Sequence, residues 1–187
     1  MNLDPIATNI YLANIPDDAY DLATGIIRIT LGVMIIAHGY AKGVTSSKRS
    51  GTAGWFHSIG MRPGGLHAFL AAYTEMTIGA LLVLGLLTTF AAAGLVGVMV
   101  VAGWTVHRKS GFLITKGGYE YVALIALMSV ALATLGPGEA SLDHQIGIAQ
   151  DLNGWTGLWL SAGLGIAMAV LQLAAFFRPK SAAESND

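Results

Sequence analysis

The feature that most constrains this fold is a long apolar run, Leu66 to Val106, which contains a single carboxylate, Glu75. A helix crosses the hydrocarbon core with roughly 20 apolar residues, so this run is long enough for two membrane spans. Gly85, Thr88 and Thr89 near its middle predict a tight hairpin between them. Only 11% of the chain is charged, against about a quarter in soluble domains. That composition excludes an ordinary soluble domain and a nucleic-acid-binding module, and the absence of cysteine excludes a disulfide scaffold.

Three further apolar runs predict three more spans. Leu22 to Tyr40 contains one charge, Arg28; Tyr119 to Leu135 is stopped by glycine and proline; Trp155 to Phe177 ends before a basic residue. Barrel strands would alternate apolar and polar residues, and these runs do not. We therefore expect an all-α, polytopic membrane helical bundle, with a four-helix core and a fifth, C-terminal transmembrane helix.

Charges outside these spans divide by side. One side receives every lysine and arginine outside the spans: Lys42, Lys48, Arg49, Arg62, Arg108, Lys109, Lys116, Arg178 and Lys180. The other side receives only carboxylates: Asp4, Asp17, Asp18, Asp21, Glu139, Asp143 and Asp151. By the positive-inside rule, we expect a multi-pass protein of the bacterial inner (plasma) membrane. Its N-terminus would lie outside and its C-terminus in the cytoplasm.

The same topology predicts the order of segments along the chain. We expect an extracytoplasmic N-terminal segment at 1–18, a four-helix membrane domain at 19–143, a loop and additional helix at 144–178, and a cytoplasmic tail at 179–187. The first twenty residues are acidic and contain two prolines, which is unlike a cleavable signal peptide. Residues 5–16 are expected to form a short amphipathic segment on the outer membrane interface.

Two charges inside the spans, Arg28 and Glu75, are expected to form a buried ion pair, because a lone charge at mid-bilayer is costly. Small residues at helical spacing flank each charge and would let the two helices approach closely; they are Gly25, Gly32 and Gly39 on one span and Ala68, Ala72 and Gly79 on the other. Two roles remain open for such a pair. It either fixes the register of the helices or forms a polar site for a proton or a ligand head group.

A second group of polar and aromatic residues lies near the cytoplasmic span ends. The candidate ligand-binding residues are His38, Trp55, His107, Glu120 and Tyr121, with His67 close by. Converging helix ends would place them around a shallow pocket for a quinone head group, whose two carbonyls need hydrogen-bond donors beside an apolar slot. The alternative is that these residues lie there simply because amphipathic side chains favour membrane interfaces.

Other chemistry is less favoured. Haem ligation by His38 and His107 fits poorly with their shallow positions, and no tight ligand spacing indicates a metal site. No nucleotide-binding or nucleophile motif is present, so we assign no catalytic residue. Gln172 is the obvious polar group of the fifth span, which we expect to serve as a packing or partner surface.

Several motifs together resemble the DoxX family of small bacterial membrane proteins, over about residues 19 to 143. They are Arg28 in the first span, AHGYAK (37–42), GTAGWFHSIGMRPG (51–64), YTEMTIGALLVLGLLT (73–88) and GGYEY (117–121). The resemblance implies a four-helix membrane core, with Arg28, His38, Glu75, His107, Glu120 and Tyr121 at family-pattern positions. The fifth helix is an addition whose role the resemblance does not supply.

The resemblance also implies a function. Some relatives are linked to thiosulfate:quinone oxidoreductase and others to membrane complexes for oxidative and thiol stress defence. We therefore expect an integral membrane subunit that supports a quinone-linked or stress-defence oxidoreductase assembly, with quinone as the possible cofactor and other membrane or peripheral proteins as partners. The alternative is a non-catalytic scaffold or assembly factor. A transporter is less favoured, since no inverted repeat or broken span is visible.

Overall fold

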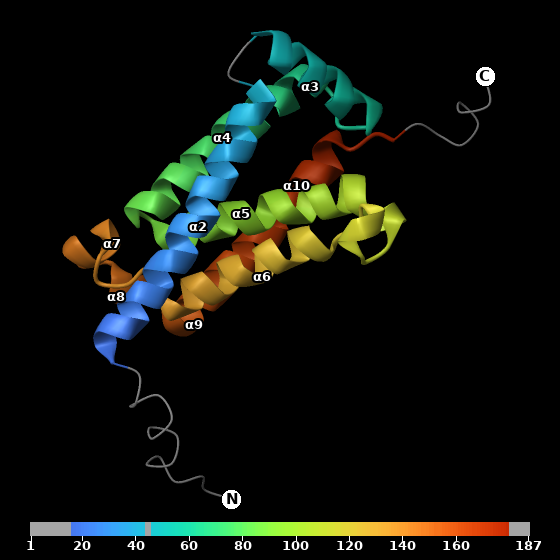
Figure 1. Cartoon of the computed structure of the whole chain (residues 1–187). Coiled ribbons are helices and arrows are strands. Elements are labelled where there is room, and N and C mark those ends of the chain that lie inside the picture. The colour runs from blue at the N-terminus through green and yellow to red at the C-terminus, as the bar shows by residue number, and fades with distance from the viewer. Residues whose placement is uncertain (1–15, 44–45, 180–187) are drawn as a thin grey trace, which may run out of the picture.

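The computed structural model describes residues 16–43 and 46–179, and the described chain is built from helices (Figure 1). The predicted interfacial segment before Pro16 and the tail from residue 180 lie outside the described residues. The long elements are α2 (Asp17–Gly43), α4 (Gly64–Leu84), α5 (Thr88–Ala102), α6 (Glu120–Leu135), and α9 (Gly154–Trp159) followed by α10 (Gly165–Phe176). The predicted all-α membrane bundle is confirmed.

Within the described residues, four helical stretches are long and apolar enough to cross a membrane: Asp17–Gly43, Gly64–Leu84, Thr88–Ser110 and Gly154–Phe176. The remaining predicted span, α6, has 16 residues. At 1.5 Å per residue it is about 24 Å long, somewhat shorter than the hydrocarbon core. The chain is therefore a multi-pass membrane protein whose helices match the five predicted runs.

The hairpin predicted between α4 and α5 forms at residues 85–87. Gly85 adopts a left-handed conformation, with φ of 64°, and its N–H caps carbonyls at the end of α4. Asp143, in the short helix α7 (Leu142–Gln145), accepts hydrogen bonds from the first N–H groups around α5, those of Leu87 (2.6 Å) and Thr88 (2.8 Å). These donors have no partner inside the helix, so the carboxylate caps α5 from outside.

Helices α2 and α4 pack along their small residues, as predicted. A Cβ added to Gly32 would lie 2.8 Å from the Gly79 carbonyl oxygen, and one at Gly39 would lie 2.6 Å from that of Ala72. Helix α5 packs against α4, α6 and α10. The central core joins α2, α4, α5 and α6 through Leu31, Ile35, Ile78, Leu82, Leu95, Ile125 and Leu132.

Two π turns interrupt the regular helices. One, Gly103–His107, continues α5, and the other, Leu160–Leu164, joins α9 to α10. A Cβ at Gly165, just after the second turn, would lie 2.6 Å from the Ala93 carbonyl of α5. The fifth span therefore packs at backbone distance against the four-helix core.

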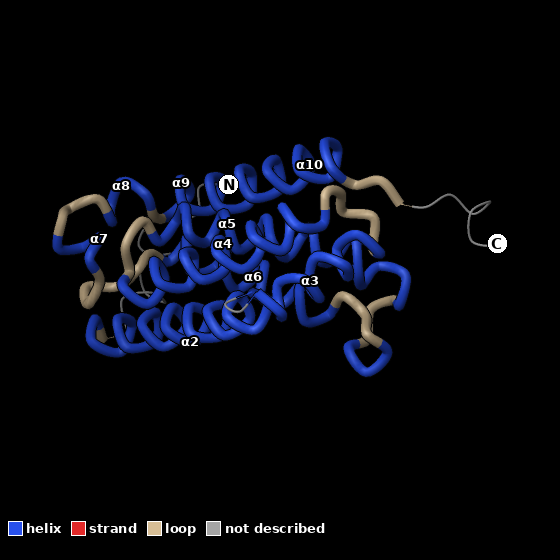
Figure 2. Tube along the Cα trace, turned by 90° about the horizontal axis from the view of Figure 1, so that it is seen from above, coloured by secondary structure: helices blue, strands red, loops and turns tan. Residues whose placement is uncertain are grey.

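The bundle has two distinct ends (Figure 2). One end carries α7 (Leu142–Gln145), α8 (Ala149–Leu152) and the start of α9, beside the beginning of α2. The other carries α3 (Ser46–Ser58), the loop between α5 and α6, and the end of α10. We call these the acidic end and the basic end, because they bear the two predicted sets of charges as far as the structure describes them.

A candidate ligand cavity at the basic end

The predicted ion pair between Arg28 and Glu75 is wrong, although both side chains are buried, at 3% and 2% exposure. The Arg28 guanidinium donates to the carbonyls of Ala140 (Nη2, 2.7 Å) and Val83 (Nη1, 3.4 Å). Asp143 lies near enough to interact with it electrostatically. Arg28 therefore ties α2 to the loop at the acidic end of the bundle.

The reason lies in the direction of helical side chains. In an α-helix each side chain leans toward the helix N-terminus, and α2 and α4 run antiparallel. Arg28 leans toward the acidic end, where it reaches Val83, while Glu75 leans toward the basic end. Val83 is eight residues beyond Glu75 on α4, or about 12 Å along the axis, so the two charges diverge.

Glu75 pairs instead with Lys42, in the last turn of α2. The Lys42 Nζ lies 2.5 Å from Oε1 and 2.6 Å from Oε2 of Glu75. The Glu75 side chain is 2% exposed and the Lys42 side chain 28% exposed, so the pair lies at the edge of the buried region. Lys42 also leans toward its own helix N-terminus, which directs the ammonium group inward to the carboxylate.

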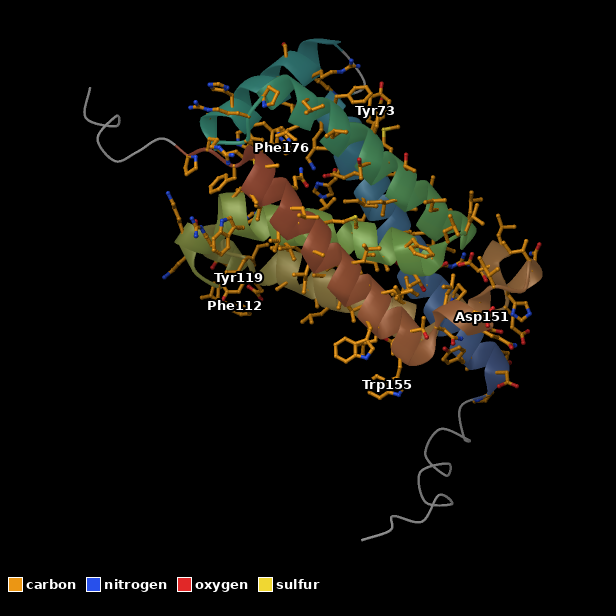
Figure 3. All side chains as sticks on the ribbon, turned by 180° about the vertical axis from the view of Figure 1, so that it is seen from behind. Tyr73, Phe112, Tyr119, Asp151, Trp155 and Phe176 are labelled. Atoms are coloured by element: carbon orange, nitrogen blue, oxygen red, sulfur yellow. The ribbon has the colours of Figure 1, made fainter. Side chains whose placement is uncertain are left out.

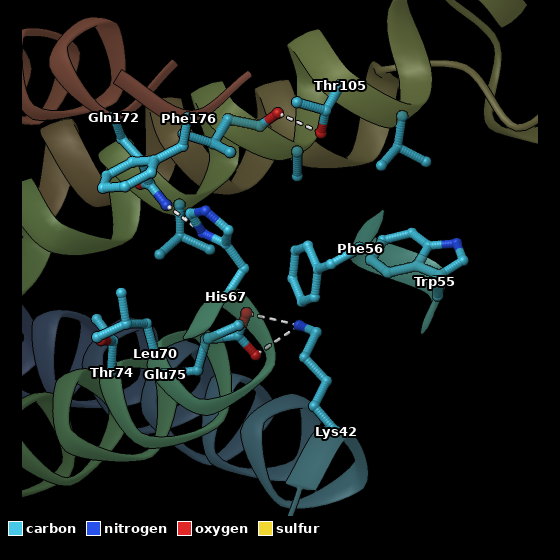
Figure 4. A pocket seen from close by; sticks show the side chains of 15 residues that line it. Lys42, Trp55, Phe56, His67, Leu70, Thr74, Glu75, Thr105, Gln172 and Phe176 are labelled. Carbon is cyan, nitrogen blue, oxygen red and sulfur yellow. Dashed lines mark hydrogen bonds and ion pairs between the residues drawn. The ribbon is translucent and has the colours of Figure 1, made fainter. Parts of the chain in front are cut away.

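This pair forms one wall of a cavity of about 220 Å³ (Figure 4). Apolar side chains from α4 and from α5 with its π turn make most of the lining, including Leu70, Ala71, Val98, Val101, Ala102 and Val106. Thr105 also lines it, and its hydroxyl donates a hydrogen bond to the Val101 carbonyl at 2.8 Å. The cavity is thus an apolar space with a few polar groups at its walls.

A second polar pair, His67 and Gln172, also lines the cavity. Gln172 Nε2 lies 3.5 Å from His67 Nδ1, which joins α10 to α4. His67 is 1% exposed, and its Nε2 has no hydrogen-bond partner among the described residues. A buried ring nitrogen without a partner is costly in a folded protein. His67 therefore lines the cavity with one ring nitrogen unpaired.

Aromatic rings surround the histidine. The His67 ring centroid lies 5.1 Å from that of Phe176 and 6.0 Å from that of Phe56. Trp55 packs edge-on against Phe56, with centroids 5.0 Å apart. Flat ring faces of this kind favour a flat, apolar ligand.

The residues predicted to form one binding pocket lie at separate sites in the structure. Trp55 lines the cavity, and with His38 and Lys42 it lines a shallow hollow on the outer surface nearby. His107 and Glu120 instead bind the α5–α6 loop: His107 Nδ1 lies 2.8 Å from the Gly117 carbonyl, and Glu120 accepts from the Ile114 N–H at 2.9 Å.

Tyr121 lies elsewhere again, with its hydroxyl 2.7 Å from the Met34 sulfur. The single polar pocket predicted from four converging helix ends is therefore wrong in its geometry, because two of its members are occupied in shaping a loop. A quinone-binding role for any of these residues remains a prediction.

Lys42, Gln172 and Phe176 are cavity residues that the sequence analysis did not include in its predicted pocket, whereas it did place His67 beside that pocket. Lys42 entered only as a mark of topology, and Gln172 only as a polar group on a packing helix. One signal was available for Lys42: it lies next to Gly43 and one turn after His38, on the span that carries the small residues. In the described ranges, no three His, Asp or Glu side chains gather where they could hold a metal ion.

Comparison with known proteins shows which family part of this chain resembles. The model of the DoxX family matches residues 23–108, which run from the first turns of α2 to the end of the α5 π turn. This stretch of the chain is similar to the DoxX family. All the cavity residues lie within it except Gln172 and Phe176, which the fifth span contributes.

A relative extends the comparison. Over 93 residues the chain is 29% identical to an uncharacterized protein of Haemophilus influenzae, a match that covers 50% of this chain and 62% of the relative. The chain therefore spans less than two thirds of that relative's length. No solved structure is significantly similar to this chain.

Proposed function

We propose that this DoxX-family protein is a membrane subunit that holds the ring of a lipid-soluble quinone in the cavity at its basic end. The observation that carries the proposal is the pairing of two polar walls across an apolar space. Lys42, held by Glu75, forms one wall, and His67 with a free Nε2 forms another. Both residues offer hydrogen bonds to the carbonyl oxygens of a quinone.

The size and lining of the cavity support a ring head group as the ligand. Its volume of about 220 Å³ lies below the roughly 300–1,000 Å³ typical of sites that enclose drug-sized ligands. A single substituted ring suits the smaller volume of this cavity, and its isoprenoid chain would extend into the bilayer. Phe56 and Phe176 supply aromatic contacts for the ring (Figure 4).

The same geometry suggests how the subunit contributes to a quinone-linked assembly. Quinone reduction consumes electrons and protons, and this sequence contains no cysteine that could act as a dithiol electron donor. We therefore assign electron supply to a partner oxidoreductase, in keeping with the expected membrane or peripheral partners. Glu75 and His67 would exchange protons with the ring oxygens. Lys42 also lines a hollow with His38 and Trp55, at the end of the bundle that we expect to face the cytoplasm of a bacterial inner membrane.

The test uses Trp55 as a reporter in the cavity wall. Trp104, Trp155 and Trp159 are changed to phenylalanine, and the protein in lipid nanodiscs is titrated with decylubiquinone. We expect saturable quenching of Trp55, weakened about tenfold or more by His67→Phe. The matched control is His144→Phe, which changes an exposed histidine at the acidic end. Linear quenching, equal in both variants, would show only partition into the bilayer and would overturn the proposal.

A second candidate function is a non-catalytic scaffold, and the two polar pairs favour it specifically. Lys42–Glu75 joins α2 to α4, and Gln172–His67 joins α10 to α4, so each pair also locks two helices together. Under this alternative, Glu75→Gln lowers thermal stability but leaves the activity of the partner complex unchanged per folded molecule. Loss of that activity in a fully folded Glu75→Gln variant would count against the scaffold.

A further inference from the structure

We propose that a second site, on the opposite face of the end of α5, binds an anionic glycerophospholipid. The site is a groove of about 280 Å³ between α5 and α6 at the basic end. It shares no lining residue with the quinone cavity. The proposal therefore stands whether or not the proposed function is correct.

The floor of the groove is apolar and follows the two helices into the membrane. Its residues are Met99, Val100 and Gly103 on α5 and its π turn, and Val122, Ala123 and Ala126 on α6. From Arg108 back to Met99 is nine residues, or about 13 Å of helix. That length suits the upper part of an acyl chain, and small residues on the floor leave room for it.

The mouth of the groove is polar and cationic. Arg108 stacks over Trp104, with its guanidinium carbon 4.1 Å from the ring centroid, and this contact holds the charge at the mouth. Tyr119 lines the opposite side and packs edge-on against Phe112, with centroids 5.5 Å apart (Figure 3). A guanidinium and a phenol together suit a phosphate.

The surrounding loop strengthens the preference for negative charge. Lys109 and Lys116 lie in the same loop as Arg108. The nearest carboxylate in sequence, Glu120, is turned into the loop, where it accepts the Ile114 N–H. Phe112, Leu113 and Ile114 are exposed large apolar side chains, which places the loop at the membrane interface where head groups lie. A basic mouth over an apolar groove at that depth fits an anionic phospholipid rather than a soluble anion.

The experiment follows Trp104 in a protein whose other three tryptophans are changed to phenylalanine. This protein is reconstituted in phosphatidylcholine vesicles that contain increasing fractions of phosphatidylglycerol with brominated acyl chains, or of brominated phosphatidylcholine. We expect phosphatidylglycerol to quench Trp104 at a fraction at least about fivefold lower than phosphatidylcholine does. Arg108→Gln should abolish that preference, while Lys109→Gln, the same charge loss one residue away, should retain most of it.

A second variant tests the groove independently of charge. Ala123→Phe fills the floor, so it should reduce quenching by brominated phosphatidylglycerol while Arg108 remains. Equal loss in the Arg108 and Lys109 variants would show a diffuse electrostatic attraction and overturn the site. Equal quenching by the two lipids in the unmodified groove would overturn it as well. Helix content measured by circular dichroism in phosphatidylcholine confirms that each variant is folded.

Discussion

Lys42 and Glu75 owe their pairing to the antiparallel arrangement of α2 and α4. Each side chain leans toward the start of its own helix, so a residue near the end of α2 and one in the middle of α4 converge. The carboxylate is almost fully buried, whereas the ammonium side chain keeps 28% exposure. Loss of the ion pair therefore costs the two residues different amounts of free energy. Lys42 can turn toward water without its partner, whereas the buried Glu75 carboxylate cannot.

This asymmetry predicts the order of stability of three variants. Lys42→Met leaves the Glu75 carboxylate buried without a partner and should lower the free energy of unfolding by about 1–3 kcal/mol, less than the 3–5 kcal/mol for fully buried pairs. Glu75→Gln should cost less, and adding it to Lys42→Met should recover part of the loss. Denaturant titration in mixed micelles measures each value, with Lys109→Met as the exposed-lysine control. Equal instability of Lys42→Met and the double variant would contradict the argument.

The sequence predicted that both intramembrane charges are buried, but it did not predict their partners. Burial follows from the cost of charge in hydrocarbon, which any position in a span shares. The partner of each charge depends on helix register and side-chain direction, and neither can be derived from the positions of Arg28 and Glu75 in the sequence. His107 and Glu120 show the same limit, since their loop contacts depend on a turn that hydropathy cannot describe.

At the scale of elements, the contact between α2 and α4 depends on glycine. A Cβ at Gly79 would lie 2.5 Å from the Gly32 carbonyl, so the two backbones leave no room for a side chain. Gly25, on the same helix as Gly32, differs, because a Cβ there would meet no atom of the described residues within 4 Å. The close approach of α2 and α4 could be predicted from the small residues in the sequence, because helices that approach closely in lipid need small side chains at the contact.

Gly79→Ala is expected to push α2 away from α4 and to cost about 1–3 kcal/mol, as overpacking does in closely packed cores. Gly25→Ala, the matched control, should cost nothing, since alanine favours the helix and the space is open. Thermal unfolding in one detergent compares the two variants directly. A similar loss in both would mean that helix content rather than packing sets the effect.

The short helix α7, which follows α6 in the chain, holds the α4–α5 turn through hydrogen bonds. Asp143 is 3% exposed, and its two oxygens each accept one N–H at the start of α5. Its own N–H donates to the Gly85 carbonyl at 2.8 Å. The carboxylate thus fastens the turn in which Leu87 has φ of 49°, a conformation that a leucine adopts only when its surroundings hold it.

Asp143→Ala should therefore destabilise the protein by about 0.5–2 kcal/mol, the usual cost of losing a helix N-cap. The local effect should be faster hydrogen exchange at the amides of Leu87 and Thr88. Asp151→Ala removes an exposed carboxylate at the same end and should leave both quantities unchanged. Unaltered exchange at the two amides in Asp143→Ala would show that the turn is stable without the Asp143 carboxylate.

At the scale of the whole molecule, the fifth span closes a cavity that is otherwise lined by the segment similar to the DoxX family. Gln172 and Phe176 close the cavity opposite Glu75, and α10 packs on α5 through Gly165. Hydropathy predicted this helix because its apolar run is long, but its place against α5 could not be predicted. That place follows from backbone contact at a glycine and from a π turn, and neither leaves a periodic signal in the sequence.

The two ends of the bundle also differ in charge, and this asymmetry predicts the orientation of the chain. Basic residues lie at the end that carries α3 and the α5–α6 loop, so that end should face the cytoplasm. The sequence contains no cysteine, so a single introduced thiol reports its own side without background. Ser110 at the basic end and Gln145 at the acidic end are both exposed, which makes them matched positions.

We expect a membrane-impermeant maleimide to label Gln145→Cys in intact cells, and to label Ser110→Cys only after the inner membrane is permeabilised. The reason is electrostatic, because loops rich in lysine and arginine are retained on the cytoplasmic side during insertion. Labelling of both variants after permeabilisation controls for thiol access. The reverse pattern in intact cells would invert the topology and place both the cavity lined by Lys42 and His67 and the groove lined by Arg108 at the outer leaflet. Labelling of both thiols in intact cells would mean that residues 110 and 145 lie on one side of the membrane, which contradicts a crossing by α6, the predicted span between them.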